Sequence, residues 1–321
     1  METQVAPRAR TGASRHADSW VFLDGEMVRY RDAYLPPMTH ALHYGTGCFE
    51  GIRAYWNAAQ QQLYLLQAEA HYARLRRSAS VLRLDVPHSN HELIELTLEI
   101  LRRNQARTDT YIRPLVFISE EEIGVKLHGL QRSFLIYTAP MGDYIDTQAG
   151  IRCMTSSWRR VSDSAIPARA KITGAYVNSA LAKSEALENG FDEAVMLTQD
   201  GHVSEGSAEN LFMVRDGVFV TPSVTEEILE GITRGLLIGL IRDELGMEVV
   251  ERSIDRTELY TCDELFLCGT GAQVSAVAEV DRRTIGSGSV GPLTRRLQEI
   301  YFRAVRGDET RYRDWLMPVY G

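Results

Sequence analysis

The chain contains 321 residues, more than one typical hydrophobic core accommodates, and this length favours two domains. Hydrophobic residues make up 44% and charged residues 24% of the chain, as in an ordinary globular protein. The net charge of −8 argues against nucleic acid or an anionic membrane as the main partner. No apolar run approaches the length that spans a membrane.

The N-terminal composition and the cysteines favour a cytoplasmic protein. Residues 1–17 contain three arginines but no apolar segment of a secretory signal, so residues 1–18 are predicted to form a disordered extension. The four cysteines have the spacing of neither a disulfide framework nor a metal-binding pair, which favours buried thiols in a reducing compartment. The eight histidines show no motif such as HExxH, so no metal site is expected.

The first half of the chain predicts a smaller α/β domain over residues 19–140. Residues 20–30 alternate in polarity around Asp24-Gly25 and predict a β-hairpin. Pro114 lacks a backbone N–H, which favours an edge position or a bulge for its strand. The remaining patterns predict strands at 63–66, 111–118 and 133–139 and helices at 67–84 and 91–104.

Residues 141–150 are predicted to link this domain to a larger one over residues 151–321. Asp200-Gly201 and Asp216-Gly217 predict hairpin turns in the second domain. The other predicted elements are strands at 151–158, 247–252 and 263–268 and helices at 175–189, 232–245 and 292–306.

The stretch from 203 to 234 combines two groups of opposite polarity. Glu205 supplies a carboxylate before the hairpin, and Gly231-Ile232-Thr233 opens a helix. Free N–H groups and the helix dipole make such a helix start an anion site. A cofactor with a phosphate at one end and a basic ring nitrogen at the other, such as pyridoxal phosphate, would use both groups.

The ordered motifs of the second half resemble the signature of the class IV (fold type IV) pyridoxal-phosphate aminotransferases, closest to the branched-chain amino acid branch. The matching positions in the first motif are Glu205, Ser207, Asn210-Leu211-Phe212, Val220, Pro222, Leu229, Gly231-Ile232 and Arg234. A second motif consists of Ile166-Pro167, Lys171, Gly174 and Tyr176. The resemblance extends from about residue 20 to about residue 316. It implies a small N-terminal α/β domain and a larger C-terminal α/β domain of pseudo-barrel form in a homodimer.

The resemblance also assigns the cofactor residues. Lys171 is the Schiff-base lysine, Tyr176 contacts the ring phenolate, and Glu205 keeps the pyridine nitrogen protonated. Lys183, in the following helix, serves as a dispensable control. Leu229 packs on the ring, and the phosphate is held by Arg74, Thr270 and the N–H groups of Ile232 and Thr233.

Substrate residues follow from the same resemblance. Tyr111 and Arg113, in a Tyr-x-Arg-Pro strand, meet substrate carboxylates. N–H groups near Gly271 and Ala272 bind the α-carboxylate. The loop over residues 120–130 is implied to reach the pocket of the neighbouring subunit. The predicted pocket wall consists of Tyr44, Phe49, Gly51, Ile123, Val125 and Tyr144.

The implied activity is transamination of leucine, isoleucine and valine with α-ketoglutarate by a ping-pong mechanism, so the small-molecule partners are amino acids and keto acids. One alternative is a D-amino acid or (R)-amine transaminase, against which the Tyr111-x-Arg113 strand argues. Another is aminodeoxychorismate lyase, and a third is a cofactor-binding protein without turnover. Met141, where many branched-chain enzymes carry tryptophan, and the Val-Lys-Leu-His loop depart from the family pattern and leave the substrate range open.

Overall fold

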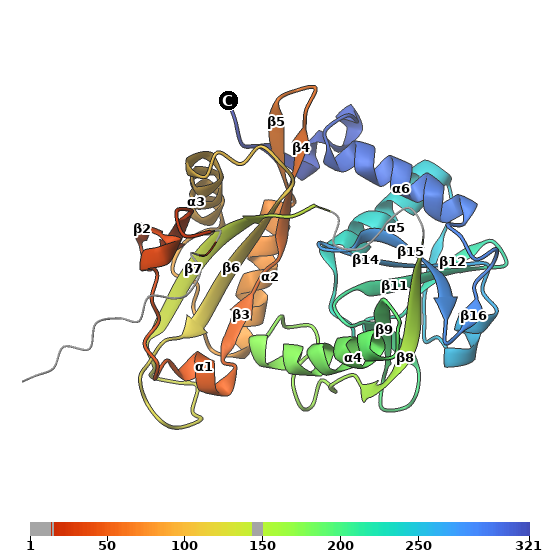
Figure 1. Ribbon diagram of the computed structural model, residues 1–321, viewed down its shortest axis with the longest axis horizontal. Helices are drawn as coiled ribbons and strands as arrows, with labels where there is room; N and C mark the ends of the chain where they lie inside the picture. The colour runs from red at the N-terminus through yellow and green to blue at the C-terminus, as the bar shows by residue number, and fades with distance from the viewer. Residues whose placement is uncertain (1–13, 15, 143–149) are drawn as a thin grey trace, which may run out of the picture.

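The computed structural model describes residues 14, 16–142 and 150–321. Two β-sheets lie side by side, each with its own helices (Figure 1). This mixed arrangement confirms the predicted α/β class. The predicted extension over residues 1–18 falls mostly outside the described residues.

The first sheet is antiparallel and has the strand order β17-β5-β4-β6-β7-β1-β2, with β3 also paired to β6. Helices α2 and α3 pack on it through one apolar core. Its elements are β1 (Trp20–Leu23), β2 (Glu26–Arg29), η1 (Tyr30–Asp32), α1 (His40–Tyr44), β3 (Gly47–Phe49), β4 (Ile52–Asn57), β5 (Gln62–Leu66), α2 (Ala68–Val81), α3 (Asn90–Arg103), β6 (Thr110–Ile118), β7 (Arg132–Pro140) and β17 (Leu316–Pro318).

Local sequence explains where these helices begin. Ser89 caps α3: its hydroxyl accepts the Glu92 N–H at 3.2 Å, and the Glu92 carboxylate accepts the Ser89 N–H at 2.7 Å. This reciprocal pair satisfies two backbone donors that a helix start leaves open. In α2, Tyr72 and Leu75 are fully buried against the sheet, as the helical spacing predicts.

Pro114 does not lie at an edge, because β6 runs between β4 and β7. The edge expectation is therefore wrong. The Pro114 carbonyl accepts the Glu50 N–H at 2.9 Å, so this side of the residue faces the break between β3 and β4. A ladder that is already interrupted there tolerates a residue without an N–H.

The second sheet is mixed and has the order β10-β9-β8-β15-β14-β11-β12-β13, with β16 paired to β15. Helices α5 and α6 cover one face, and α4 packs on β8 and β9. Its elements are β8 (Ile151–Arg159), η2 (Thr173–Ala175), α4 (Tyr176–Glu188), β9 (Glu193–Leu197), β10 (Val203–Gly206), β11 (Asn210–Arg215), β12 (Val218–Thr221), α5 (Ile232–Leu245), β13 (Val249–Glu251), η3 (Arg256–Tyr260), β14 (Glu264–Gly269), β15 (Gln273–Val280), β16 (Arg283–Thr284), α6 (Pro292–Val305) and η4 (Thr310–Trp315).

The turn between β11 and β12 shows why its sequence specifies a hairpin. Asp216 and Gly217 have φ angles of 51° and 74°, which a two-residue turn of the right twist requires. The predicted hairpin is confirmed.

The C-terminal strand crosses between the two halves. β17 pairs with β5 in the first sheet, although the sequence assigned everything after residue 150 to the second domain. Most of the predicted linker, residues 143–149, lies outside the described residues. In the part of the chain that the structure describes, no helix is long and apolar enough to cross a membrane.

Candidate active site

A cavity of about 690 Å³ lies between the first sheet, α2 and the start of α5. Residues from both sheets meet there. Of the residues predicted from sequence, its lining includes Phe49, Gly51, Arg74, Tyr111, Arg113, Lys171, Tyr176, Leu229, Thr233, Thr270 and Gly271. Residues spread over more than two hundred positions of sequence thus line one cavity.

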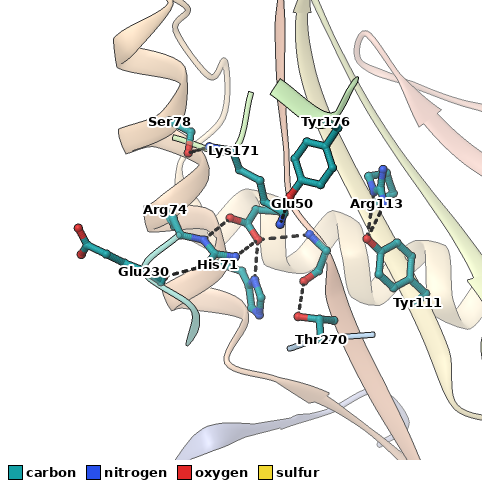
Figure 2. Close-up of polar contacts among 11 residues, drawn as sticks. Glu50, His71, Arg74, Ser78, Tyr111, Arg113, Lys171, Tyr176, Glu230 and Thr270 are labelled. Atoms are coloured by element: carbon teal, nitrogen blue, oxygen red, sulfur yellow. Dashed lines mark hydrogen bonds and ion pairs between the residues drawn. The ribbon is translucent and has the colours of Figure 1, made fainter. Parts of the chain in front are cut away.

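Lys171 is one of three lysines in the chain, with Lys126 and Lys183. Its backbone is fixed on both sides, because its N–H donates to Ser78 Oγ at 3.0 Å and its carbonyl accepts the Phe49 N–H at 3.1 Å. Its Nζ donates to the Tyr176 hydroxyl at 2.6 Å (Figure 2). The amine is therefore presented to the cavity from a rigid backbone position.

The other two lysines are placed differently. Lys126 is exposed and pairs with Glu122. Lys183 Nζ lies 2.7 Å from Glu193 Oε2, and Glu193 is completely buried. Removing Lys183 would leave a buried carboxylate without its countercharge, at a cost of about 3–5 kcal/mol. Lys183 is therefore structural and unsuitable as the dispensable control that the sequence indicated.

Glu205 is a buried carboxylate with a fixed orientation. Its Oε1 lies 2.7 Å from Arg160 Nη2, and its Oε2 accepts from Asn210 Nδ2 and from the Leu229 N–H, each at 3.0 Å. Burial raises the pKa of Glu205, while the Arg160 guanidinium and the Leu229 N–H oppose the rise. Glu205 and Lys171 line a second, smaller cavity of about 30 Å³.

The start of α5 forms one wall of the larger cavity. Its first residue is Ile232, and no side chain caps it at Gly231. A Cβ at Gly231 would lie 1.9 Å from Asn210 Oδ1, so only glycine fits between Asn210 and the helix start. Thr233 is buried and lines the cavity. Uncapped N–H groups at a helix start suit an anion such as phosphate.

Two further groups border this anion site. Arg74, from α2, is buried and donates through Nη1 to the Glu230 carbonyl at 3.0 Å. Thr270 Oγ1 donates to the Gly51 carbonyl at 2.9 Å (Figure 2). An arginine and a hydroxyl thus lie beside the same cavity as the α5 N-terminus, as the resemblance implied.

The β6 strand supplies the opposite wall. The Tyr111 hydroxyl accepts from Arg113 Nη2 at 2.6 Å and from Nε at 3.1 Å. Burial raises the pKa of Tyr111, although the positive charge of Arg113 opposes the rise. The Arg113 guanidinium lies 4.3 Å from the centre of the Phe49 ring, a cation–π contact. This wall combines one cation with aromatic surface.

Several predicted substrate residues do not line this cavity. Tyr44, Ile123 and Val125 are 38%, 84% and 78% exposed. They lie together, since the Gly124 N–H donates to the Tyr44 hydroxyl at 3.3 Å. Ala272 is buried beside Gly271. Tyr144 lies outside the described residues.

Several site residues were not predicted. Arg160 orients Glu205, Glu50 pairs with Arg74, and His71 contacts Glu50. Tyr137 lies directly opposite Arg113 in the β6–β7 register and lines the cavity. A period-two alignment of strands 111–118 and 133–139 could have found Tyr137. No local pattern marks Arg160 or Glu50.

Comparison with known proteins defines the class. The model of the amino-transferase class IV family matches residues 47–280. A probable branched-chain-amino-acid aminotransferase of Aquifex aeolicus is 50% identical over 301 residues, covering 94% of this chain and 97% of the relative. The chain belongs to the class IV aminotransferases, and it is a pyridoxal-phosphate-dependent transferase of fold type IV.

Solved structures agree in fold and sequence. A branched-chain aminotransferase from the archaeon Thermoproteus uzoniensis, with norvaline, has a TM-score of 0.90 at 44% identity, covering 94% of this chain and 99% of that chain. A branched-chain amino acid aminotransferase from Thermobaculum terrenum, in its PLP-bound holo form, has a TM-score of 0.91 at 36% identity, covering 96% of this chain and 100% of that chain.

The donor set of the cavity fits the cofactor. Lys171 lines the smaller cavity together with the buried carboxylate of Glu205, and it lines the larger one together with the buried Arg74 and the uncapped start of α5. The described residues contain no cluster of three His, Cys, Asp or Glu side chains that could hold a metal ion.

Proposed function

We propose that the protein transfers the amino group of branched-chain L-amino acids to α-ketoglutarate, giving branched-chain keto acids and L-glutamate. The observation that carries this proposal is the β6–β7 wall, where Arg113 stands among Tyr111, Phe49, Leu115 and Tyr137. A mostly apolar wall accommodates a branched aliphatic side chain, and the single cation binds a dicarboxylic substrate.

Lys171 acts as the covalent anchor and the proton carrier of the reaction. When bound, pyridoxal phosphate withdraws electrons from the α-carbon of an amino acid and makes its proton acidic. Lys171 Nζ, released by the substrate amine, would remove this proton from the α-carbon and deliver it to the cofactor's aldehyde carbon, two bonds away. The Tyr176 hydroxyl, 2.6 Å from Nζ, orients the amine.

The remaining residues bind the cofactor and the substrate and keep the cofactor's ring nitrogen charged. Glu205, paired with Arg160, holds a proton on the cofactor's ring nitrogen, because an anion beside that nitrogen favours its charged form. Leu229 supports the ring. Arg74, Thr270 and the N–H groups of Ile232 and Thr233 bind the phosphate, and those near Gly271 and Ala272 bind the substrate α-carboxylate.

The two substrates use the site in turn, which implies ping-pong kinetics. Arg113 pairs with the distal carboxylate of α-ketoglutarate or glutamate. With leucine, Arg113 remains engaged by the Tyr111 hydroxyl and the Phe49 ring, so it is not left as an unpaired charge beside an apolar side chain.

Exposed apolar residues support a homodimer. Leu42, Ile123 and Val125 are 60%, 84% and 78% exposed, and large exposed apolar side chains that lie close together mark an interaction surface. His40 Nε2 contacts the Gly124 carbonyl at 2.7 Å and ties the loop to α1. In this dimer Tyr44, Ile123 and Val125 complete the partner's pocket. Sedimentation of the protein tests the assembly.

The four cysteines of the protein are buried and unpaired, which is consistent with a cytoplasmic location.

The visible absorbance of the purified protein tests the reaction. L-leucine added without a keto acid is expected to remove the band of the lysine-bound cofactor, and α-ketoglutarate is expected to restore it. A band that ignores L-leucine but responds to D-alanine or an (R)-amine would assign the protein to that alternative class. Absence of any band, even after addition of pyridoxal phosphate, would refute the proposed function.

The attachment point can be mapped directly, because the chain has only three lysines. Borohydride reduction followed by peptide mass mapping should place the adduct on the peptide of Lys171. Lys171→Ala should lose the band, and Lys126→Ala is the matched control that should keep it. An adduct on another lysine would overturn the assignment.

A further inference from the structure

Glu50 lies in the segment between β3 and β4 and is completely buried. Its Oε1 accepts from Arg74 Nε at 2.7 Å, and its Oε2 accepts from Arg74 Nη2 at 2.8 Å. His71, one turn before Arg74 on α2, places Nδ1 2.7 Å from the same Oε2 (Figure 2). A carboxylate only accepts, so His71 Nδ1 carries the proton. The backbone of Glu50 is fixed by β6 through the Pro114 carbonyl.

The contacts of Arg74 define which of its edges is available. A guanidinium has five N–H groups. Among the described residues, Glu50 takes two of the N–H groups and the Glu230 carbonyl takes one. Two N–H groups, one on each terminal nitrogen, remain for a group in the cavity that Arg74 lines. Glu50 thus holds the edge of the guanidinium that carries Nε and Nη2, and the end with the two terminal nitrogens is left for a group in the cavity.

Charge supports the same arrangement. Burial alone would raise the pKa of Glu50, but the Arg74 guanidinium and the His71 N–H hold it well below its usual range. Burial lowers the pKa of His71, against the attraction of Glu50, so the imidazole is neutral near pH 7. The other charges that act on His71 are those of Arg74 and Lys171. Glu50 is therefore ionised at neutral pH and orients Arg74. His71 holds the Glu50 carboxylate in place without adding a positive charge.

We propose that Glu50 and His71 are positioning residues that aim Arg74 at the phosphate of the cofactor. They do not touch the cofactor themselves. The inference rests on the proposed function only in that the bound group carries a phosphate.

A glutamine at position 50 would spoil the geometry. Its amide nitrogen would replace one of the two carboxylate oxygens. In place of Oε1 it would set a donor against Arg74 Nε, and in place of Oε2 it would set a donor against Arg74 Nη2 and His71 Nδ1. The experiment measures the Kd of the cofactor-free protein for pyridoxal phosphate and for pyridoxal, which lacks the phosphate. Glu50→Gln should raise the Kd for pyridoxal phosphate by about 10- to 100-fold, the effect of losing one charged hydrogen bond, and leave that for pyridoxal unchanged.

His71 provides a second, milder series. His71→Leu should raise the Kd for pyridoxal phosphate, and His71→Asn should restore it, because the asparagine amide can donate from the position of Nδ1. Glu264→Gln is the matched control. Glu264 is also buried and accepts three hydrogen bonds, from the Leu293 N–H and from the N–H and hydroxyl of Thr294, at the end of β14 away from Gly269. This variant should lower the midpoint of thermal unfolding without changing the Kd.

Two results would overturn the inference. One is an equal rise of both Kd values in Glu50→Gln, and the other is a wild-type Kd for pyridoxal phosphate in both Glu50→Gln and His71→Leu. If the wild-type protein bound no pyridoxal phosphate, the proposed function would fail by itself. Inorganic phosphate then decides the inference: it should raise the unfolding midpoint of the wild-type protein and of Glu264→Gln, but not that of Glu50→Gln.

Discussion

Gly51 leaves no room for a side chain, and this makes Gly51→Ala a sharp perturbation. A Cβ at this position would lie 2.4 Å from the Tyr111 hydroxyl oxygen. A carbon and an oxygen normally stay about 3.3 Å apart, so the hydroxyl has to move by roughly 1 Å. That hydroxyl accepts from Arg113 Nη2 at 2.6 Å and from Nε at 3.1 Å. A shift of this size breaks at least one of the two hydrogen bonds.

The cost follows from these contacts. A hydrogen bond to a charged group contributes about 1.5–3 kcal/mol, and each 1.4 kcal/mol is a factor of ten. If Arg113 binds the distal carboxylate, kcat/KM for α-ketoglutarate should fall by about 10- to 100-fold. The half-reaction with L-leucine should fall less, because its side chain makes no ion pair with Arg113. Stopped-flow measurement of each half-reaction separates the two effects.

Two further variants control the measurement. Gly235→Ala places a Cβ in open space on α5 and should leave both half-reactions unchanged. Combining Gly51→Ala with Tyr111→Phe removes the oxygen at 2.4 Å, and the nearest ring atom then lies 3.1 Å away. The loss of kcat/KM in the double variant should therefore be smaller than the sum of the losses in the two single variants. Equal losses for both substrates, or strict additivity, would refute the claim that Gly51 acts through Tyr111 and Arg113.

Three other variants test separate parts of the site. Glu205→Gln should keep the cofactor absorbance but slow the leucine half-reaction strongly, because a neutral amide no longer favours a protonated ring nitrogen; near-normal turnover would remove this role. Arg113→Ala should raise KM for α-ketoglutarate more than for leucine in steady-state assays, and equal rises would contradict the two-substrate argument. Burial and the neighbouring Glu193 raise the pKa of Glu209 to about 8. Between pH 4.5 and 8 the unfolded chain loses this proton and the folded chain keeps it, so the wild type loses stability as pH rises. Glu209→Gln lacks this proton, so its midpoint of thermal unfolding should rise relative to that of the wild type over the same range. A difference between the two proteins that does not change with pH would contradict this prediction.

The sequence predicted elements wherever neighbouring residues carry the information. The hairpin turns at Asp24-Gly25 and Asp216-Gly217 are confirmed, because a turn is decided within about four residues. The edge position expected for Pro114 is wrong, since its environment depends on Glu50, which lies far along the chain and next to it in the sheet.

The same reasoning explains which site residues were missed. Lys171 and Glu205 belong to ordered local motifs, but the carboxylate of Glu205 is oriented by Arg160, and the two are 45 positions apart in sequence. Glu50 reaches Arg74 across 24 positions. A side chain that pairs across elements leaves no periodic signal, because its partner is set by how the sheets and helices pack. Such residues become visible only in three dimensions.

His71 is the exception, since it lay within reach of a sequence argument. His71, Arg74 and Ser78 are spaced i, i+3 and i+7 on α2, and all three are buried. Buried polar residues at helical spacing need partners, and these have them: Glu50 for the first two and the Lys171 N–H for Ser78. One helix therefore fixes both the arginine that we propose for the phosphate and the backbone N–H of Lys171, so α2 helps to set the separation between these two residues.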